Sequence, residues 1–393
     1  MKKNILAKAT VLAASSVMLF SMAACGSSSS AASPASEASS AGTAQTSEAA
    51  SSASSSAEES TAASSAEVQT SSGSKAAAGT EFKVGVVQYV DHASLNQIVE
   101  NLEQELDAKG QELGVTFNYK DYEFNGQGDG TTLNQIASEL ISDDVDLIVA
   151  VATPTAQIMQ AAAEGKDIPI VFSAVSDPVG AKLVDSLDAP GANITGTSDA
   201  LDTEAIMNLI LAQNPDTKKV GLLYSKSEDS SAQPVADAKK ILEEKGIETV
   251  EKTGTTQDEI STAADALIAE GVDAVFTPTD NTVMTAELAI YEKFAEAGIP
   301  HYAGADSFAR NGAFCGYGVD YKALGSQTAD MVAKILAEGA DPASTPVETS
   351  DSSIATVNTE TAAALGYDMD QVKKNFEPYC ASVEETTTNK EME

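Results

Sequence analysis

The chain contains two copies of one sequence pattern. Residues 145–155 read VDLIVAVATPT, and residues 272–282 read VDAVFTPTDNT. Each copy follows a helix-like segment and leads into a second helix and a short strand-like run. Further upstream, KVGVVQY at 83–89 is matched by KVGLLYS at 219–225. A chain with two similar α/β halves is expected to form two lobes, and a ligand is expected to bind between them.

The segments between these matches alternate between strand and helix patterns. Apolar runs rich in β-branched residues predict buried parallel strands, and apolar residues at helical spacing predict the helices between them. Gly110 suits the C-terminus of the first helix, over 94–110. The order predicts an α/β fold with two doubly wound parallel-sheet lobes joined by a multi-strand hinge.

The predicted boundaries divide the chain into five parts. The first lobe takes residues 81–197 plus about 320–342, where a helix over about 321–338 packs back on it. The second lobe takes residues 198–319 plus about 343–383, including a strand at 353–358 and a helix at 359–366. Residues 384–393 are expected to form a polar, frayed tail.

The N-terminus is predicted to be a signal peptide over residues 1–24. Three lysines precede an apolar stretch that is too short for a spanning helix and stops at Cys25. Small residues directly before this cysteine resemble a bacterial lipobox, which implies cleavage before Cys25 and lipidation of its thiol. The alternative is an ordinary secretory signal with an incidental cysteine.

Residues 25–80 are predicted to be a tether between that cysteine and the lobes. They are mostly Ser, Ala, Thr, Gly and Glu and include no aromatic residue. Such a segment cannot bury enough apolar area to offset its ordering entropy, so disorder is expected. It either holds the lobes away from a membrane or serves as a spacer without a particular length requirement.

The charge and the remaining cysteines restrict the partners. The net charge is −36, and almost all of it lies after residue 79. A strongly acidic body makes nucleic acid or an anionic membrane surface a poor partner. Cys315 and Cys380 do not make a disulfide framework, and they can pair only if the fold brings them together.

Ligands of open parallel sheets bind beyond the carboxyl ends of the strands, so the residues there are the candidate site. In the first lobe an aromatic and polar group follows the first strand and either contacts a planar ligand or forms a solvated loop. Thr153 and its neighbours begin a helix whose free N–H groups either hold an anion or are simply capped. The first-lobe candidates are Gln88, Tyr89, His92, Thr153, Thr155, Ala156, Ser173 and Asp177; Ser176 is a further candidate for a polar contact, and Asp199 belongs either to the hinge or to the pocket.

In the second lobe the corresponding strand ends carry acids. Asp280 stands where the first copy has Thr153, and Asp306 follows the next strand. Either Asp280 caps its helix or these acids accept hydrogen bonds from a ligand cation. Helix N-termini on one lobe and acids on the other suit a zwitterion such as an α-amino acid. The second-lobe candidates are Tyr224, Thr279, Asp280, Asn281, Asp306 and Asp320.

Signals for catalysis are weak. The chain has only two histidines, and it shows no zinc-ligand spacing, Walker loop or nucleophile-elbow motif. No catalytic residue, metal or cofactor is therefore expected. An enzyme that uses Asp280 and Asp306 for acid–base chemistry remains a third alternative.

Several long stretches resemble the substrate-binding lipoproteins of ABC importers of the tryptophan/tyrosine-associated kind. They are VVQYVDHASLN (86–96), LNQIASELISDDVDLIVAVATPTAQ (133–157), IPIVFSAVSDPVGAKLV (168–184), PGANITGTSD (190–199), VGLLYSKSEDSS (220–231), PTDNTV (278–283) and GVDYKALGSQTADMVAKIL (318–336). The resemblance implies a type I periplasmic-binding-protein fold, a monomer without catalysis, and an aromatic or related amino acid as ligand.

The same resemblance implies an ABC permease and its ATPase as partners, with a lipid anchor at the outer face of the cell membrane. Two alternatives remain open: binding of a different small solute, and a sensory receptor that presents its liganded form to a signalling protein.

Overall fold

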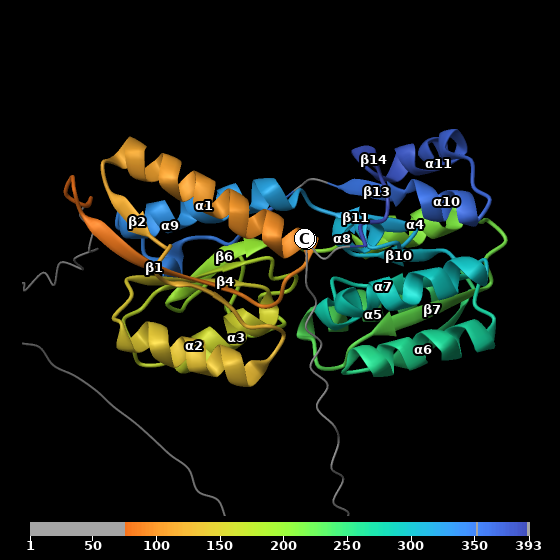
Figure 1. Ribbon diagram of the computed structural model, residues 1–393, viewed down its shortest axis with the longest axis horizontal. Helices are drawn as coiled ribbons and strands as arrows, with labels where there is room; N and C mark the ends of the chain where they lie inside the picture. Colours follow the sequence, from red (N-terminus) through yellow and green to blue (C-terminus); the bar gives the residue numbers. More distant parts are fainter. Residues whose placement is uncertain (1–74, 351–352, 391–393) are drawn as a thin grey trace, which may run out of the picture. The chain divides into compact units, whose positions relative to one another are not determined.

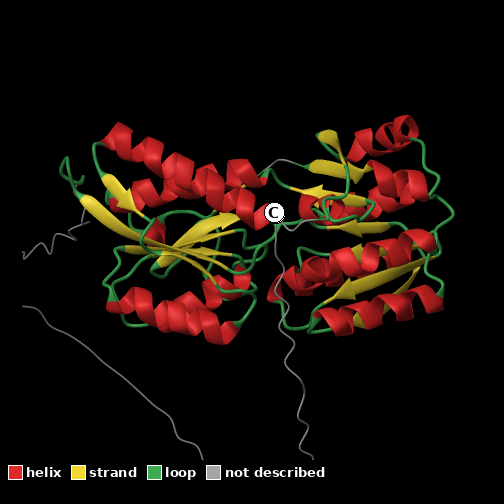
Figure 2. Cartoon of the chain, in the orientation of Figure 1, coloured by secondary structure: helices red, strands yellow, loops and turns green. Residues whose placement is uncertain are grey.

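The computed structural model describes residues 75–350 and 353–390, all of which belong to one compact unit. The predicted signal peptide, Cys25 and residues 25–74 of the predicted tether lie outside the described residues. The described part contains two sheets, each flanked by helices on both faces (Figures 1 and 2). The predicted fold class is therefore confirmed.

The first sheet has the strand order β12-β6-β5-β4-β1-β2, and β3 also pairs with β1. Helices α1 and α9 pack together on one face, and α2 and α3 pack together on the other (Figure 1). Its elements are β1 (Glu81–Gln88), α1 (Ala93–Leu113), β2 (Thr116–Asn118), β3 (Glu123–Asn125), α2 (Gly130–Ser142), β4 (Leu147–Val151), α3 (Thr153–Ala162), β5 (Ile170–Ser173), β6 (Ile194–Ser198), α9 (Tyr321–Leu336), the 3₁₀ turn η2 (Pro342–Ser344) and β12 (Glu348–Thr349).

The second sheet has the order β14-β13-β11-β10-β9-β7-β8, in which β11 and β13 pair antiparallel. Helices α6 and α7 pack together, as do α4 and α5 (Figure 1). Its elements are α4 (Thr203–Gln213), β7 (Lys219–Tyr224), η1 (Asp229–Ser231), α5 (Ala232–Glu244), β8 (Glu248–Thr253), α6 (Gln257–Glu270), β9 (Ala274–Thr277), α7 (Asn281–Glu296), β10 (His301–Ala303), α8 (Asp306–Arg310), β11 (Cys315–Gly318), β13 (Ile354–Asn358), α10 (Thr359–Ala364), α11 (Met369–Phe376), η3 (Glu377–Tyr379) and β14 (Ser382–Thr386).

The continuous apolar runs of the central strands follow from burial on both faces. In β4, Leu147, Val149 and Val151 join one core cluster. Ile148 and Ala150 join the cluster on the opposite face. Since successive strand residues point to opposite faces, every residue of such a strand must be apolar.

The chain passes between the sheets three times, and the last crossing comes later than expected. The first two crossings follow β6 and β11. Glu348 and Thr349 pair with Thr197 and Ser198 of β6, so the first lobe extends past residue 342 to Thr349. A two-residue strand carries too little sequence pattern to be recognised in advance.

Both ends of the described body are more ordered than expected. The predicted frayed tail from residue 384 instead contributes to β14, which pairs with β13 and covers its edge. At the other end, the Ala76 N–H donates to the Ala337 carbonyl at 2.8 Å, so residues 75–80 of the predicted tether pack on the first lobe. Helix α1 also continues past Gly110 and ends at Gly114, whose φ of 71° suits glycine.

Cys315 and Cys380 are both free thiols and pack in the same apolar cluster of the second lobe. Burial raises the pKa of the Cys315 thiol, so it behaves as a small apolar side chain. Over residues 75–350 and 353–390, no helix has the length and apolarity needed to cross a bilayer.

Candidate functional site

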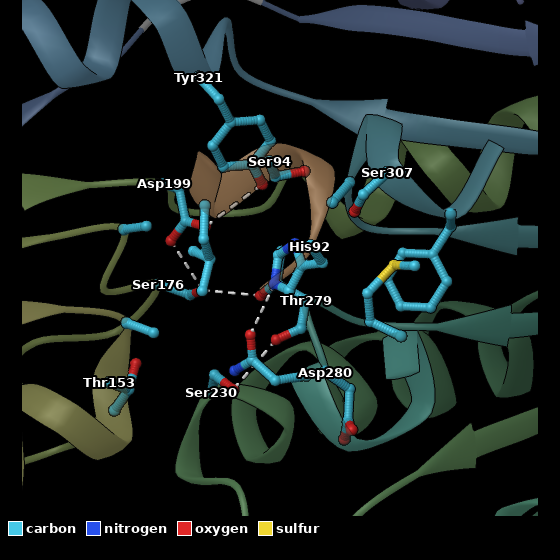
Figure 3. Close-up of a pocket in the computed structure, with 17 residues that line it drawn as sticks. His92, Ser94, Thr153, Ser176, Asp199, Ser230, Thr279, Asp280, Ser307 and Tyr321 are labelled. Carbon is cyan, nitrogen blue, oxygen red and sulfur yellow. Dashed lines mark hydrogen bonds between the residues drawn. The ribbon is translucent and has the colours of Figure 1, made fainter. Parts of the chain in front are cut away.

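A cavity lies where the carboxyl ends of strands from both sheets meet (Figure 3). It contains about 390 Å³ of space not filled by protein atoms, part of which is open solvent. It is lined by His92, Ser94, Leu95, Ala152, Thr153, Ala174, Ser176, Asp199, Ser230, Thr279, Asp280, Asn281, Met284, Ala305, Ser307, Phe308 and Tyr321.

On the first-lobe side, the cavity meets the N-terminus of α3. The N-cap residue is Ala152, which has no side chain that could accept a hydrogen bond from the first turn. Its φ of 79° and ψ of 153° lie in a region that non-glycine residues rarely occupy. Ala174, after β5, also has a positive φ of 55°. The site therefore holds backbone strain beside a helix start that no side chain caps.

Asp199 is the acid on this wall. Its side chain is buried, and it follows β6 directly. Ser176 Oγ donates to its Oδ1 at 2.9 Å, and the Tyr321 hydroxyl lies 3.4 Å from its Oδ2. Burial raises the pKa of the Asp199 carboxyl. None of the described residues that line the cavity is Lys or Arg, so this acid has no cationic neighbour there.

On the second-lobe side, the N–H groups at the N-terminus of α7 already donate hydrogen bonds to acidic side chains of the protein. Asp280 is 1% exposed and accepts hydrogen bonds from Ser225 N, Ser231 Oγ and Val283 N at 2.7–2.9 Å. Burial, and then the neighbouring Glu228, raise the pKa of Asp280 to about 8. Of the two alternatives for Asp280, the structure shows the helix cap.

Glu228 is a second buried acid at the same helix start. Its Oε2 accepts from the backbone N and side-chain Nδ2 of Asn281 at 2.9 and 2.8 Å. Its Oε1 accepts from the backbone N and hydroxyl of Thr282 at 2.6 and 2.7 Å. Burial raises the pKa of Glu228. The donors of α7 therefore go to the protein's own acids and not to a ligand.

His92 connects the two lobes across the cavity. It is the N-cap residue of α1, and its Nε2 lies 3.1 Å from Asn281 Oδ1. Burial lowers the pKa of His92, which favours the neutral ring. A second contact joins Ser176 Oγ and Thr279 Oγ1 at 2.7 Å. These hydrogen bonds hold the lobes together around the cavity (Figure 3).

Asp306 does not line this cavity. It accepts from Ser94 Oγ and Gln97 Nε2 of α1 at 2.8 and 3.2 Å and pairs with Arg310 Nε at 2.7 Å. The hypothesis that Asp280 and Asp306 form an ammonium site is therefore not supported, because their oxygens already serve the helix start and the contact between lobes.

Of the predicted site residues, His92, Thr153, Thr279, Asp280 and Asn281 line the cavity, as does the further polar candidate Ser176, and nine lie elsewhere. Four of the nine stabilise loops, helix starts or strand edges through hydrogen bonds. The pairs are Gln88 with Asn96, Asp177 with Gly180, Tyr224 with Glu251, and Asp320 with Ala323.

The others of the nine are packed into the fold. Ser173 bonds to Thr328 of α9, Thr155 and Ala156 are fully buried, and the half-buried Tyr89 donates to the Gly128 carbonyl at 3.2 Å. Burial and the nearby Glu228 raise the pKa of Tyr89 to about 12.

The sequence reasoning missed several cavity residues. Asp199, for which the sequence leaves hinge and pocket open, lines the cavity, and its place directly after a strand is the signal that the other candidates also carry. Met284, Ser307 and Phe308 lie inside the first turns of α7 and α8, where nothing in the sequence distinguishes a cavity-facing residue from a core residue.

The cavity is equipped for binding and not for covalent chemistry. None of the described hydroxyls that line it is hydrogen-bonded to a histidine, the usual base of a nucleophilic serine. Within the described ranges, no group of three or more His, Cys, Asp or Glu side chains could hold a metal ion. It offers one buried acid without a cation beside it, one helix start without a side-chain cap, and an apolar wall.

Comparisons with known proteins agree with this geometry. A family described as "ABC transporter substrate binding protein" matches residues 83–373. A protein of Clostridioides difficile (strain R20291) named "Tyrosine-binding protein" is 32% identical over 321 residues, which cover 82% of this chain and 91% of that protein.

Solved structures with this fold are also similar. One from Streptococcus pneumoniae, described as an ABC domain in complex with L-Trp, has a TM-score of 0.70 at 30% identity and covers 77% of this chain and 100% of its own. The ligand-free, open structure of a Clostridium difficile substrate binding protein has a TM-score of 0.59 at 32% identity, covering 78% and 100%.

The matches extend over most of the described residues and over nearly the whole length of these relatives. Solute-binding proteins of this kind capture their ligands without chemical conversion, so the chain is not an enzyme. The chain belongs to the family of ABC transporter substrate-binding proteins.

Proposed function

We propose that this protein captures an aromatic α-amino acid in the cavity between its lobes for delivery to an ABC permease. The observation that carries the proposal is Asp199, a buried carboxyl group without a cation beside it among the cavity residues. A buried unpaired charge is costly, and a ligand ammonium would remove that cost. Because burial raises the pKa of Asp199, arrival of a cation would also favour its ionised form.

The carboxylate of the ligand is assigned to the N-terminus of α3. Ala152 and Thr153 line the cavity at the start of this helix, no side chain caps its first turn, and the helix dipole favours a negative charge there. Both charged groups of the ligand would then rest on the first lobe. This differs from the sequence hypothesis, which placed the ammonium on the second lobe.

The side chain of the ligand is assigned to the apolar wall. Leu95, Met284 and Phe308 line the cavity together, and thioether and aromatic groups pack well on a ring. One relative is named a tyrosine-binding protein and another is solved with L-Trp, which supports an aromatic ligand.

The location is proposed from the N-terminal sequence. Cys25 would carry the lipid after cleavage of residues 1–24, and the Ser/Ala-rich tether would hold the lobes as a monomer at the outer face of the cell membrane. The permease and its ATPase are the partners at the level of the family.

Native mass spectrometry of the freshly purified protein, followed by calorimetric titration with the amino acid it carries, tests the ligand assignment. Asp199→Asn should lower affinity by at least about 100-fold, because the ammonium loses its charged partner inside a low-dielectric site. Asp177→Asn is the matched control, since Asp177 only closes an exposed turn, and it should leave affinity within about 3-fold. Full affinity in Asp199→Asn would contradict the proposal.

A further inference from the structure

Two polar atoms in the cavity wall have no hydrogen-bond partner among the described residues. They are His92 Nδ1, on the first lobe, and Ser307 Oγ, on the second. His92 is 6% exposed and Ser307 is fully buried. Buried polar groups in native proteins nearly always have a partner, and leaving one without a partner is costly. Two polar atoms without a partner in the wall of one cavity therefore indicate that the ligand supplies their hydrogen-bonding group.

A chain of hydrogen bonds determines which ring nitrogen of His92 carries the proton and which one can accept a hydrogen bond. Glu228 accepts from Asn281 Nδ2, so Asn281 Oδ1 is the atom that faces His92. That oxygen can only accept, and the His92 Nε2 must therefore carry the ring proton. In the neutral ring, Nδ1 is then a bare acceptor that points away from Asn281.

Ser307 Oγ is complementary to this acceptor. A hydroxyl rotates freely and can donate a hydrogen bond. One acceptor and one available donor together fit a ligand group that can donate and accept at the same time, as a phenol does. An unsubstituted phenyl ring would leave both atoms unpaired.

We infer that His92 and Ser307 form a subsite that selects an aromatic amino acid with a ring hydroxyl over one without it. This inference rests on the proposed function and adds which ring is preferred. The two residues belong to different lobes, so the ring hydroxyl can hydrogen-bond to both of them only when the lobes have come together. Sites built to hydrogen-bond a substrate hydroxyl reject the analogue that lacks it far more strongly than apolar pockets distinguish by size.

Calorimetric titration of the full chain with L-tyrosine and L-phenylalanine tests the inference. The wild type should prefer tyrosine by at least about 100-fold. His92→Phe keeps a ring of similar shape and should reduce that preference to about 3-fold or less, mainly by weakening tyrosine binding. Ser307→Ala should reduce it by about 10-fold. Ser230→Ala removes a cavity hydroxyl that already donates to the Thr279 carbonyl at 3.2 Å, and it should change both affinities alike.

A second measurement does not depend on any variant. The chain has only two histidines, so a nitrogen-detected NMR spectrum of the imidazoles resolves His92 from His301. The unliganded protein should show the Nε2–H tautomer at His92. Tyrosine should shift the Nδ1 resonance toward that of a hydrogen-bonded acceptor, and phenylalanine should leave it in place.

The outcomes separate the two proposals. Equal affinity for tyrosine and phenylalanine, or a His92 Nδ1 resonance that ignores tyrosine, overturns the subsite and leaves amino-acid binding standing. Binding of neither amino acid overturns the proposed function itself.

Discussion

Two aspartates that cap helices have pKa values shifted in opposite directions. Asp129 and Asp280 are both N-cap residues that accept hydrogen bonds from the first turn of a helix. Asp129 is exposed, and hydrogen bonds from Thr132 hold the pKa of its carboxyl below the ordinary value. Asp280 is buried beside Glu228, and both burial and that second acid raise its pKa to about 8. Both residues cap a helix, and the difference in burial decides the direction in which the pKa moves.

The raised pKa of Asp280 predicts a loss of stability as pH increases. A group whose folded pKa exceeds its unfolded value stabilises the fold below the unfolded pKa, and this contribution is lost as pH rises through the folded value. The window for Asp280 therefore runs from about 4 to about 8. Between pH 5 and pH 8 the free energy of unfolding should fall by at least about 1 kcal/mol more in wild type than in Asp280→Asn.

Urea denaturation at both pH values measures this difference, and Asp129→Asn is the control. The pKa of Asp129 is lowered, so its contribution is complete above about pH 4 and does not change between pH 5 and pH 8. Parallel pH profiles for wild type and Asp280→Asn would mean that burial does not shift this carboxyl.

At the scale of elements, the two copies of the repeat differ in how their second helix begins. The first turn of α7 donates hydrogen bonds to two acids of the protein, Asp280 and Glu228. Helix α3 instead starts at Ala152, which has a strained backbone and provides no side-chain cap. Strain that persists at a ligand cavity is commonly part of a functional arrangement. The uncapped start keeps N–H donors available, and this is what the ligand carboxylate would use.

The strain at Ala152 predicts opposite effects for two glycine substitutions in the same segment. Ala152→Gly should raise the free energy of unfolding of the unliganded protein by about 1 kcal/mol, because glycine adopts φ 79° without the steric penalty. Ala156→Gly, inside α3, should lower it by about 1 kcal/mol or more. Urea midpoints of the two variants decide this, and a loss of stability in both would argue against strain at Ala152.

The elements themselves were largely predictable, because the parallel strands are buried on both faces and must be apolar throughout. The strand ends also indicated the edge at which the cavity lies, and His92, Thr153 and Asn281 line it. The direction of each side chain did not follow. The carboxyl group of Asp280 turns back to backbone donors, while Asp199, for which the sequence leaves hinge and pocket open, lines the cavity. Loop conformation decides such directions, and it depends on contacts remote in sequence.

At the scale of the whole described molecule, the lobes meet through polar contacts around the cavity. Ser94 and Gln97 reach Asp306, His92 reaches Asn281, and Ser176 reaches Thr279. The TM-score is higher against the L-Trp complex than against the ligand-free, open structure, at similar identity and coverage. Both observations agree with an arrangement in which lobe contact and ligand capture are one event.

The central claim is that the first lobe holds both charged groups of an amino acid, the ammonium at Asp199 and the carboxylate at the start of α3. Calorimetric titration with L-tyrosine, with tyramine, which lacks the carboxylate, and with 3-(4-hydroxyphenyl)propionate, which lacks the ammonium, tests it most directly. The account predicts that each analogue binds at least about 100-fold more weakly than tyrosine. An analogue that binds as tightly as tyrosine would contradict the account.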